Sequence, residues 1–154
     1  MGEREKKLEE LGYPMSRRPP ENAVIDQVAV LGQTVYVSGF VPFDLDVLTS
    51  KGKVPSQVSV EDATKAAALC AANCLRAVAA KIGLDKIERV IRVTGYVNAD
   101  SDFTDCHLVI NGATSLLKQV FGDEAGRHAR TALGMAQLPL GTSVEVEMIL
   151  QLKN

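Results

Sequence analysis

Residues 130–152 read RTALGMAQLPLGTSVEVEMILQL, and this stretch predicts two β-strands joined by a short connection. From Val144 to Leu152 apolar and polar residues alternate, which is the pattern of a strand with one buried face. The segment 130–136 mixes small, apolar and β-branched residues and stops at Leu138-Pro139, since proline lacks a backbone donor and suits a strand boundary. Gly141-Thr142 supplies turn-forming residues between the two strands.

The same stretch carries two charged residues, Arg130 and Glu145, that are unusual in a structural strand. On pattern alone Glu145 and Glu147 are read as the solvated face of a half-buried sheet, which is common in antiparallel sheets. Arg130 is read in the same way as a surface residue where a strand begins. A functional role for either residue therefore needs support from elsewhere in the chain.

The rest of the chain predicts two more groups of strands and two main helices. The runs 28–31 and 34–38 flank Gly32-Gln33 and predict a β-hairpin, followed by a long proline-containing loop over 41–58. Ser59 to Gly83 predicts a helix with an alanine-rich face, capped by Ser59. A strand over 87–97, partly buried on both sides and with Ile91 on the same face as Val93, and a helix over 103–121 follow. Strands alternating with helices in this way predict an α+β sandwich, with one mixed sheet and both helices on one face.

Composition limits the class of protein. The chain has 154 residues, which predicts one domain over 1–154, and it has no apolar run long enough to cross a bilayer. A net charge of -2 argues against a general nucleic-acid binder. The three cysteines and the absence of a signal-peptide pattern predict a cytoplasmic protein, with Cys70 and Cys74 as small core residues. No zinc-binding spacing, phosphate loop or nucleophile motif is present, so no metal or cofactor is predicted.

Three motifs together resemble a known family. The runs VYVSGFVP (35–42), GKVP (52–55) and HARTALGMAQLPLGTSVEVE (128–147) are similar to the reactive-intermediate deaminase family, called RidA or YjgF. The resemblance covers about residues 23–152 and leaves 1–22 as an N-terminal helix and an irregular extension. It implies a chorismate-mutase-like fold, a homotrimer, and sites in clefts between subunits. Ala132 stands where relatives usually have a cysteine, and 24–26 replaces a tyrosine-containing segment, so the chain resembles a divergent branch.

The resemblance implies a mechanism and a set of site residues. Arg130 would hold the carboxylate of a 2-imino or enamino acid, and Glu145 would position the water that hydrolyses it to a 2-keto acid and ammonia. Substrate-binding roles fall less securely on four further residues: Ser38, Gly39, Asn111 and Thr131. His128, two residues before Arg130, is expected on the same side of an extended segment and is a further candidate.

Two other functions remain open from the sequence. One is a homotrimer that binds a small carboxylate such as a 2-keto acid without turning it over, which the changes at Ala132 and 24–26 favour. The other is an RNA-cleaving or chaperone-like role, of which the RNA version is disfavoured by the acidic chain and its few aromatic residues. The expected partners are a small carboxylate and other copies of the chain, with neither nucleic acid nor membrane.

Overall fold

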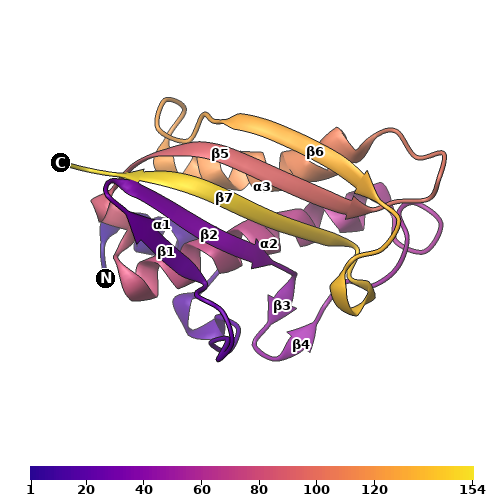
Figure 1. Cartoon of the computed structure of the whole chain (residues 1–154), viewed down its shortest axis with the longest axis horizontal. Helices are drawn as coiled ribbons and strands as arrows, with labels where there is room; N and C mark the ends of the chain where they lie inside the picture. The colour runs from indigo at the N-terminus through magenta and orange to yellow at the C-terminus, as the bar shows by residue number, and fades with distance from the viewer.

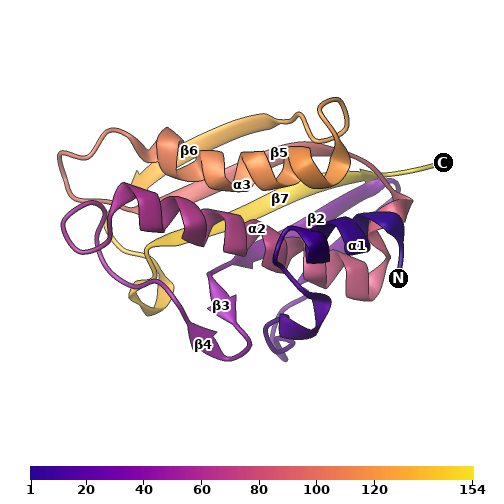
Figure 2. The same ribbon diagram turned by 180° about the vertical axis from the view of Figure 1, so that it is seen from behind.

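A twisted sheet with helices packed on one of its faces forms the molecule (Figures 1 and 2). The computed structural model describes all 154 residues. In chain order the elements are α1 (Glu3–Glu10), a 3-10 turn (Met15–Arg17), β1 (Val28–Leu31), β2 (Thr34–Phe40), β3 (Phe43–Asp44), β4 (Val47–Leu48), α2 (Val60–Lys81), a 3-10 turn (Leu84–Lys86), β5 (Ile87–Asn98), α3 (Cys106–Phe121), β6 (Ala129–Met135), a 3-10 turn (Pro139–Gly141) and β7 (Val144–Leu152). The predicted α+β class with one mixed sheet is confirmed.

The five main strands lie in the order β1-β2-β7-β5-β6. Strand β6 is parallel to β5, as the α3 crossover between them allows, and every other neighbouring pair in this sheet is antiparallel. The two strands of the 130–152 stretch are therefore not neighbours, because β5 lies between them. The turn that joins them leads β7 past the end of β5 into the centre of the sheet, and it leaves β6 at an edge (Figure 1).

The face of β7 predicted to be buried does pack under the helices. Val144, Val146 and Leu150 are fully buried and Met148 is 2% exposed. Both main helices cover this face, and they approach each other closely where α3 has a glycine (Figure 2). A Cβ on Gly112 would lie 2.0 Å from the backbone oxygen of Thr64 in α2, so only glycine fits this helix crossing.

Strand β5 corrects one prediction. Its pairing with β7 is irregular between Ile87 and Arg89 and between Val90 and Arg92. These irregularities change which face each side chain takes, so Val90 is fully buried while Ile91 is 39% exposed. The prediction that Ile91 shares a face with Val93 was wrong, because a strict alternation of faces requires an uninterrupted ladder.

The segment predicted as a loop over 41–58 contains the β3–β4 hairpin. Asn73 of α2 donates from Nδ2 to the backbone oxygens of Val41 and Phe43, at 3.2 and 2.9 Å, and so fixes the start of this hairpin to the helix layer. Val54, later in the segment, is fully buried. Much of the predicted loop is therefore tied to the body of the protein.

The N-terminal helix α1 packs firmly on the helix layer. Leu8 is fully buried, and the Arg4 guanidinium lies 4.6 Å from the centre of the Phe121 ring at the end of α3. Glu5 is buried, at 7% exposed, and accepts a hydrogen bond from the backbone nitrogen of Leu84 at 2.6 Å. None of the helices combines the length and the apolar character needed to cross a bilayer.

Candidate functional site

Arg130 lies on the edge strand β6 and is held by α3. Its Nη1 donates to Asn111 Oδ1 at 2.8 Å and to Thr114 Oγ1 at 3.2 Å. Arg130 forms no ion pair within the protomer. Because only Nη1 is used, Nε and Nη2 are free to form the two parallel bonds by which a guanidinium grips a carboxylate.

His128 belongs to the same cluster. Its Nδ1 lies 2.7 Å from the backbone oxygen of Gly126, and its Nε2 lies 3.1 Å from Thr114 Oγ1. The carbonyl can only accept, so Nδ1 carries the proton and neutral Nε2 accepts from the Thr114 hydroxyl. Burial lowers the pKa of His128, the Gly126 carbonyl raises it, and the Arg130 charge lowers it further. The lowered pKa favours the neutral imidazole, in which Thr114 accepts from Arg130 and donates to His128.

The strand register places the Arg130 side chain on the helix-covered face. Residues that oppose each other across a ladder share a face, and Arg130 pairs with Val93, which pairs with Met148. Val93 and Met148 are buried under the helices, at 0% and 2% exposed. The contacts of Arg130 to α3 agree with this placement.

Glu145 lies on the other face of the same sheet. It pairs with Tyr96, and its neighbour Glu147 pairs with Thr94 and accepts a hydrogen bond from the Tyr96 hydroxyl at 3.0 Å. Glu145 is half-buried. Burial raises the pKa of the Glu145 carboxyl, and the nearby Glu147 charge raises it further. A carboxylate with a raised pKa is better matched to proton transfer near neutrality than an ordinary one.

Ser38 and Gly39 form the wall that Glu145 faces. The pairing of β2 with β7 is interrupted between Val37 and Phe40, so Ser38 and Gly39 form a bulge opposite Glu147. A Cβ on Gly39 would lie 2.2 Å from Glu145 Oε1. The Ser38 hydroxyl donates to the backbone oxygen of Asp26 at 2.7 Å, which ties the bulge to the segment before β1.

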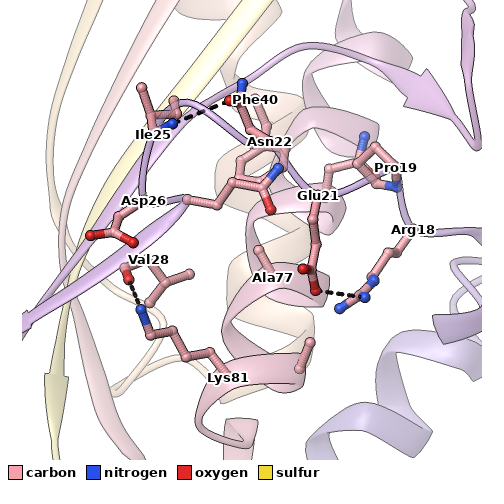
Figure 3. A pocket seen from close by; sticks show the side chains of 13 residues that line it. Arg18, Pro19, Glu21, Asn22, Ile25, Asp26, Val28, Phe40, Ala77 and Lys81 are labelled. Carbon is pink, nitrogen blue, oxygen red and sulfur yellow. Dashed lines mark hydrogen bonds and ion pairs between the residues drawn. The ribbon is translucent and has the colours of Figure 1, made fainter.

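Two cavities lie on either side of this segment, residues 18–28. One, of about 350 Å³, is lined by Ser38, Gly39 and Ile25 among others. The other, of about 340 Å³, lies between the segment and α2, where Ala77 and Lys81 line it (Figure 3). Lys81 closes one side of it by donating to the backbone oxygen of Val28 at 2.6 Å. Of the two cavities, the first reaches the bulge that faces Glu145.

The structure thus divides the candidate residues into two groups on opposite faces. Arg130, Asn111 and His128 form one group, and Ser38, Gly39 and Glu145 form the other. Thr131 lies on the open face, where its hydroxyl accepts a hydrogen bond from Arg92 Nη2 at 2.7 Å, so it does not join Arg130 within the protomer. Sequence reasoning missed Thr114, although its position three residues after Asn111 on a helix places both on one face.

No group of three or more histidine, cysteine or acidic side chains is arranged to hold a metal ion. The three cysteines are free and buried, and Cys70 and Cys74 donate to backbone oxygens of β7. The polar chemistry available at the two groups is therefore that of a guanidinium, an imidazole, hydroxyls and carboxylates.

Comparisons with known proteins identify relatives across nearly the whole chain. The family model described as Endoribonuclease L-PSP, the YjgF/RidA family, matches residues 15–151. Protein TCP17 of Trypanosoma cruzi is 36% identical over 150 residues, which cover 96% of this chain and 92% of that protein. The crystal structure of Atu1372 from Agrobacterium tumefaciens, a protein of unknown function, is 41% identical, has a TM-score of 0.89, and covers 97% of this chain and 92% of its own.

A more distant structure, E. coli TdcF with bound serine, shares the fold at 24% identity and a TM-score of 0.58, over 90% of this chain and 94% of its own. The predicted family and the predicted chorismate-mutase-like fold are both confirmed by these matches.

Proposed function

The chain belongs to the endoribonuclease L-PSP (YjgF/RidA) family, and from that premise we propose that it hydrolyses reactive 2-imino and enamino acids to 2-keto acids and ammonia. The observation that carries the proposal is the pair of half-sites on one protomer. Arg130 offers a free guanidinium edge on one face of the sheet, and Glu145 offers a partly desolvated carboxylate on the other. Neither half-site is complete alone.

A homotrimer would join the two half-sites. Because Arg130 and Glu145 of one protomer face away from each other, Arg130 meets a Glu145 only on a neighbouring protomer. The open face of the sheet also suits a subunit contact, since it exposes apolar side chains such as Leu31 (73%), Tyr36 (46%) and Leu133 (42%). Its half-buried glutamates gain further shielding when a second protomer covers them. We therefore propose clefts in which β6 and α3 of one protomer adjoin the Ser38–Gly39 bulge and Glu145 of the next.

The proposed reaction uses each group for one task. Nε and Nη2 of Arg130 hold the substrate carboxylate and so fix the adjacent imine carbon. The Glu145 carboxylate accepts a proton from water as the water oxygen bonds to that carbon, and it returns the proton to the nitrogen. In the resulting intermediate the carbon carries a hydroxyl and an amine, and Glu145 takes the hydroxyl proton and passes it to the nitrogen as the C–N bond breaks, so that ammonia leaves and the carbonyl of the 2-keto acid remains. The bound serine of E. coli TdcF supports this substrate class, because serine carries its carboxylate next to a nitrogen-bearing carbon.

One observation favours a second candidate, a carboxylate-binding protein without turnover. After Arg130, the next residues of β6 on the same face are Ala132 and Gly134, which offer no functional side chain. Arg130 can therefore hold a carboxylate at a position where β6 supplies no further side chain for a reaction. The alternative shares the trimeric cleft with the main proposal and differs only in chemistry.

A kinetic experiment separates the two functions. 2-Aminoacrylate and 2-iminopropionate are generated in situ, and release of the keto acid is followed with the wild type, Arg130→Ala and Glu145→Gln. Hydrolysis predicts faster release with the wild type, loss in Arg130→Ala, and slower turnover in Glu145→Gln with 2-keto acid binding preserved. Wild-type rates equal to buffer, together with pyruvate binding that Arg130→Ala abolishes, would replace the enzyme proposal with the binding one.

A further inference from the structure

A cavity of about 550 Å³ lies among the turn after α1, the segment between β4 and α2, and α2 itself. It shares no residue with the two groups of the candidate site. Figure 2 shows the side of the molecule on which α2 passes beside the β3–β4 hairpin and the chain that follows α1. Its walls are mostly polar, and one of them is the guanidinium of Arg76.

Arg76 is a buried cation without an ion pair. It is 2% exposed, and its Nε and Nη1 donate to the backbone oxygen of Pro14 at 3.1 Å and to Asn73 Oδ1 at 2.8 Å. Both acceptors are neutral. Nη2 donates to nothing in the chain and is not fully buried, and Arg76 is one of the residues that line the cavity. A buried charge is costly unless an opposite charge compensates it, so this guanidinium lacks a counter-anion.

The acidic groups in the cavity wall are already engaged. Asp44 accepts two hydrogen bonds from Arg17, at Nε and Nη2. Asp62 lies 4.0 Å from Lys65, an exposed lysine that also pairs with Glu61 at 3.2 Å. Burial lowers the pKa of Arg76, and Asp44 opposes this only as a more distant charge. The protein itself therefore gives Arg76 no anion within hydrogen-bond distance.

The remaining wall is rich in positive charge and donors. The cationic side chains are Arg17, Lys51, Lys65 and Arg76, against Asp44 and Asp62, which leaves an excess of two positive charges (four minus two). Half-buried Tyr13 also lines the cavity, and its hydroxyl forms no hydrogen bond in the chain. This wall has the composition expected around an oxyanion.

We propose that this cavity binds a small molecule through an oxyanion, a phosphate or carboxylate group, with Arg76 Nη2 as the central donor and Lys51, Lys65 and Tyr13 around it. The site does not depend on the proposed deaminase activity, because it lies within one protomer and shares no residue with Arg130 or Glu145. Asn73 links it to the rest of the fold, since the same side chain accepts from Arg76 and donates to Val41 and Phe43.

The binding experiment uses the full chain with two probes, inorganic phosphate and succinate, at an ionic strength held constant with sodium chloride. Calorimetric titration and thermal unfolding are measured in the wild type and in Arg130→Ala, which removes the proposed carboxylate-binding residue of the other site. We expect Arg130→Ala to bind at least one probe saturably at one site per chain, with a raised Tm, and the wild type to retain this site. Phosphate binding alone assigns a phosphate-bearing ligand, and succinate binding alone assigns a carboxylate-bearing one.

Variants locate the site. The double change Lys51→Gln and Lys65→Gln alters exposed side chains and leaves the fold intact, and it should weaken binding by about tenfold, the effect of losing a charged hydrogen bond. Arg76→Gln should abolish binding. Lys118→Gln, an exposed lysine of α3 paired with Asp123, is the matched control and should bind as the wild type does. No saturable binding of either probe, or equal binding in the double variant, would overturn the proposal.

Discussion

Glu145 occupies the space that a side chain at Gly39 would need. A Cβ on Gly39 would lie 2.2 Å from Glu145 Oε1 and 3.0 Å from its Cδ. The bulge in β2 brings the Gly39 backbone against the carboxyl group, and the missing side chain lets the carboxylate stay there. Gly39 therefore determines the position of the proposed general base.

The change Gly39→Ala should displace Glu145 and lower kcat for imine hydrolysis by about tenfold or more, because small misplacements of a catalytic group have large effects on rate. A double-mutant cycle tests the cause. Gly39→Ala should also lower the Tm in the wild type but have little effect on stability in a Glu145→Ala background. An equal loss of stability in both backgrounds would show that the methyl group meets something other than Glu145.

Substrate binding should require a guanidinium at position 130, because Asn111 and Thr114 hold Nη1 and leave the rest of the planar group for the carboxylate. Arg130→Lys keeps the charge but loses the planar fork, and we expect KM for imino acids to rise by about tenfold. Asn111→Ala should give a smaller rise, because it frees Nη1 without removing the fork. Arg89→Lys, on the neighbouring strand, serves as the control, since Arg89 contacts only the backbone oxygen of Arg127. Steady-state kinetics separate the variants.

Glu145 should make the folded chain less stable at neutral pH. Its pKa is raised above 4.5 by burial, so the folded chain binds this proton more tightly than the unfolded chain does. The contribution of this group to stability is therefore favourable at low pH and is lost as the pH rises through the raised pKa. Glu145→Gln should raise the Tm at pH 7 and have little effect near pH 4, measured by thermal unfolding across pH. A Tm lowered at pH 7 would contradict this reading of the site.

His128 should have the opposite dependence on pH. Its pKa is lowered from 6.5, chiefly by burial, so the unfolded chain binds this proton more tightly. The stabilisation from the neutral imidazole is present above about pH 6.5 and is lost as the pH falls through the lowered pKa. In His128→Gln the fall in Tm between pH 7 and 5 should be smaller than in the wild type.

The crossing of α2 and α3 should not tolerate a methyl group. Gly112→Ala would bring Cβ within 2.0 Å of the backbone oxygen of Thr64, which cannot rotate away. We expect a loss of about 1–3 kcal/mol in the free energy of unfolding, as for other overpacked cores. In Gly134→Ala the nearest atoms would lie at 3.3 Å, so that variant should change stability much less. Urea unfolding of both variants provides the comparison.

Local patterns in the sequence predicted most of the helices and strands. The order of the strands in the sheet and their register depend on pairing between distant segments, which local patterns do not show. The alternation in 144–152 and the capping of α2 by Ser59, which accepts from the Asp62 backbone nitrogen at 3.0 Å, were both readable along the chain. The insertion of β7 between β2 and β5 was not, because a register is set by partners distant in sequence. The exposure of Ile91 was hidden for the same reason, since the ladder irregularities in β5 depend on its partner.

The sequence also predicted some of the candidate site and missed the rest. The position of His128 two residues before Arg130 and the family resemblance of the run that begins at Asn111 predicted both as site residues, and both lie in the Arg130 cluster. The sequence could not show that Thr131 faces Arg92 instead, nor that Gly39 touches Glu145. Both facts depend on the parallel pairing of β6 and on the bulge in β2. The burial of Arg76 could not be predicted from the sequence, because a single arginine in an alanine-rich helix is normally exposed.

The packing of α1 also determines where the protein can be cut. The family match begins at residue 15, yet Leu8 is fully buried, and Arg4 covers the ring of Phe121. A fragment designed on the family boundary would expose the apolar surface beneath Leu8 and leave the Leu84 amide without its Glu5 acceptor. Expression of the shortened chain should therefore yield aggregation-prone material, and crystallisation or binding studies should retain the first fourteen residues that the family match omits.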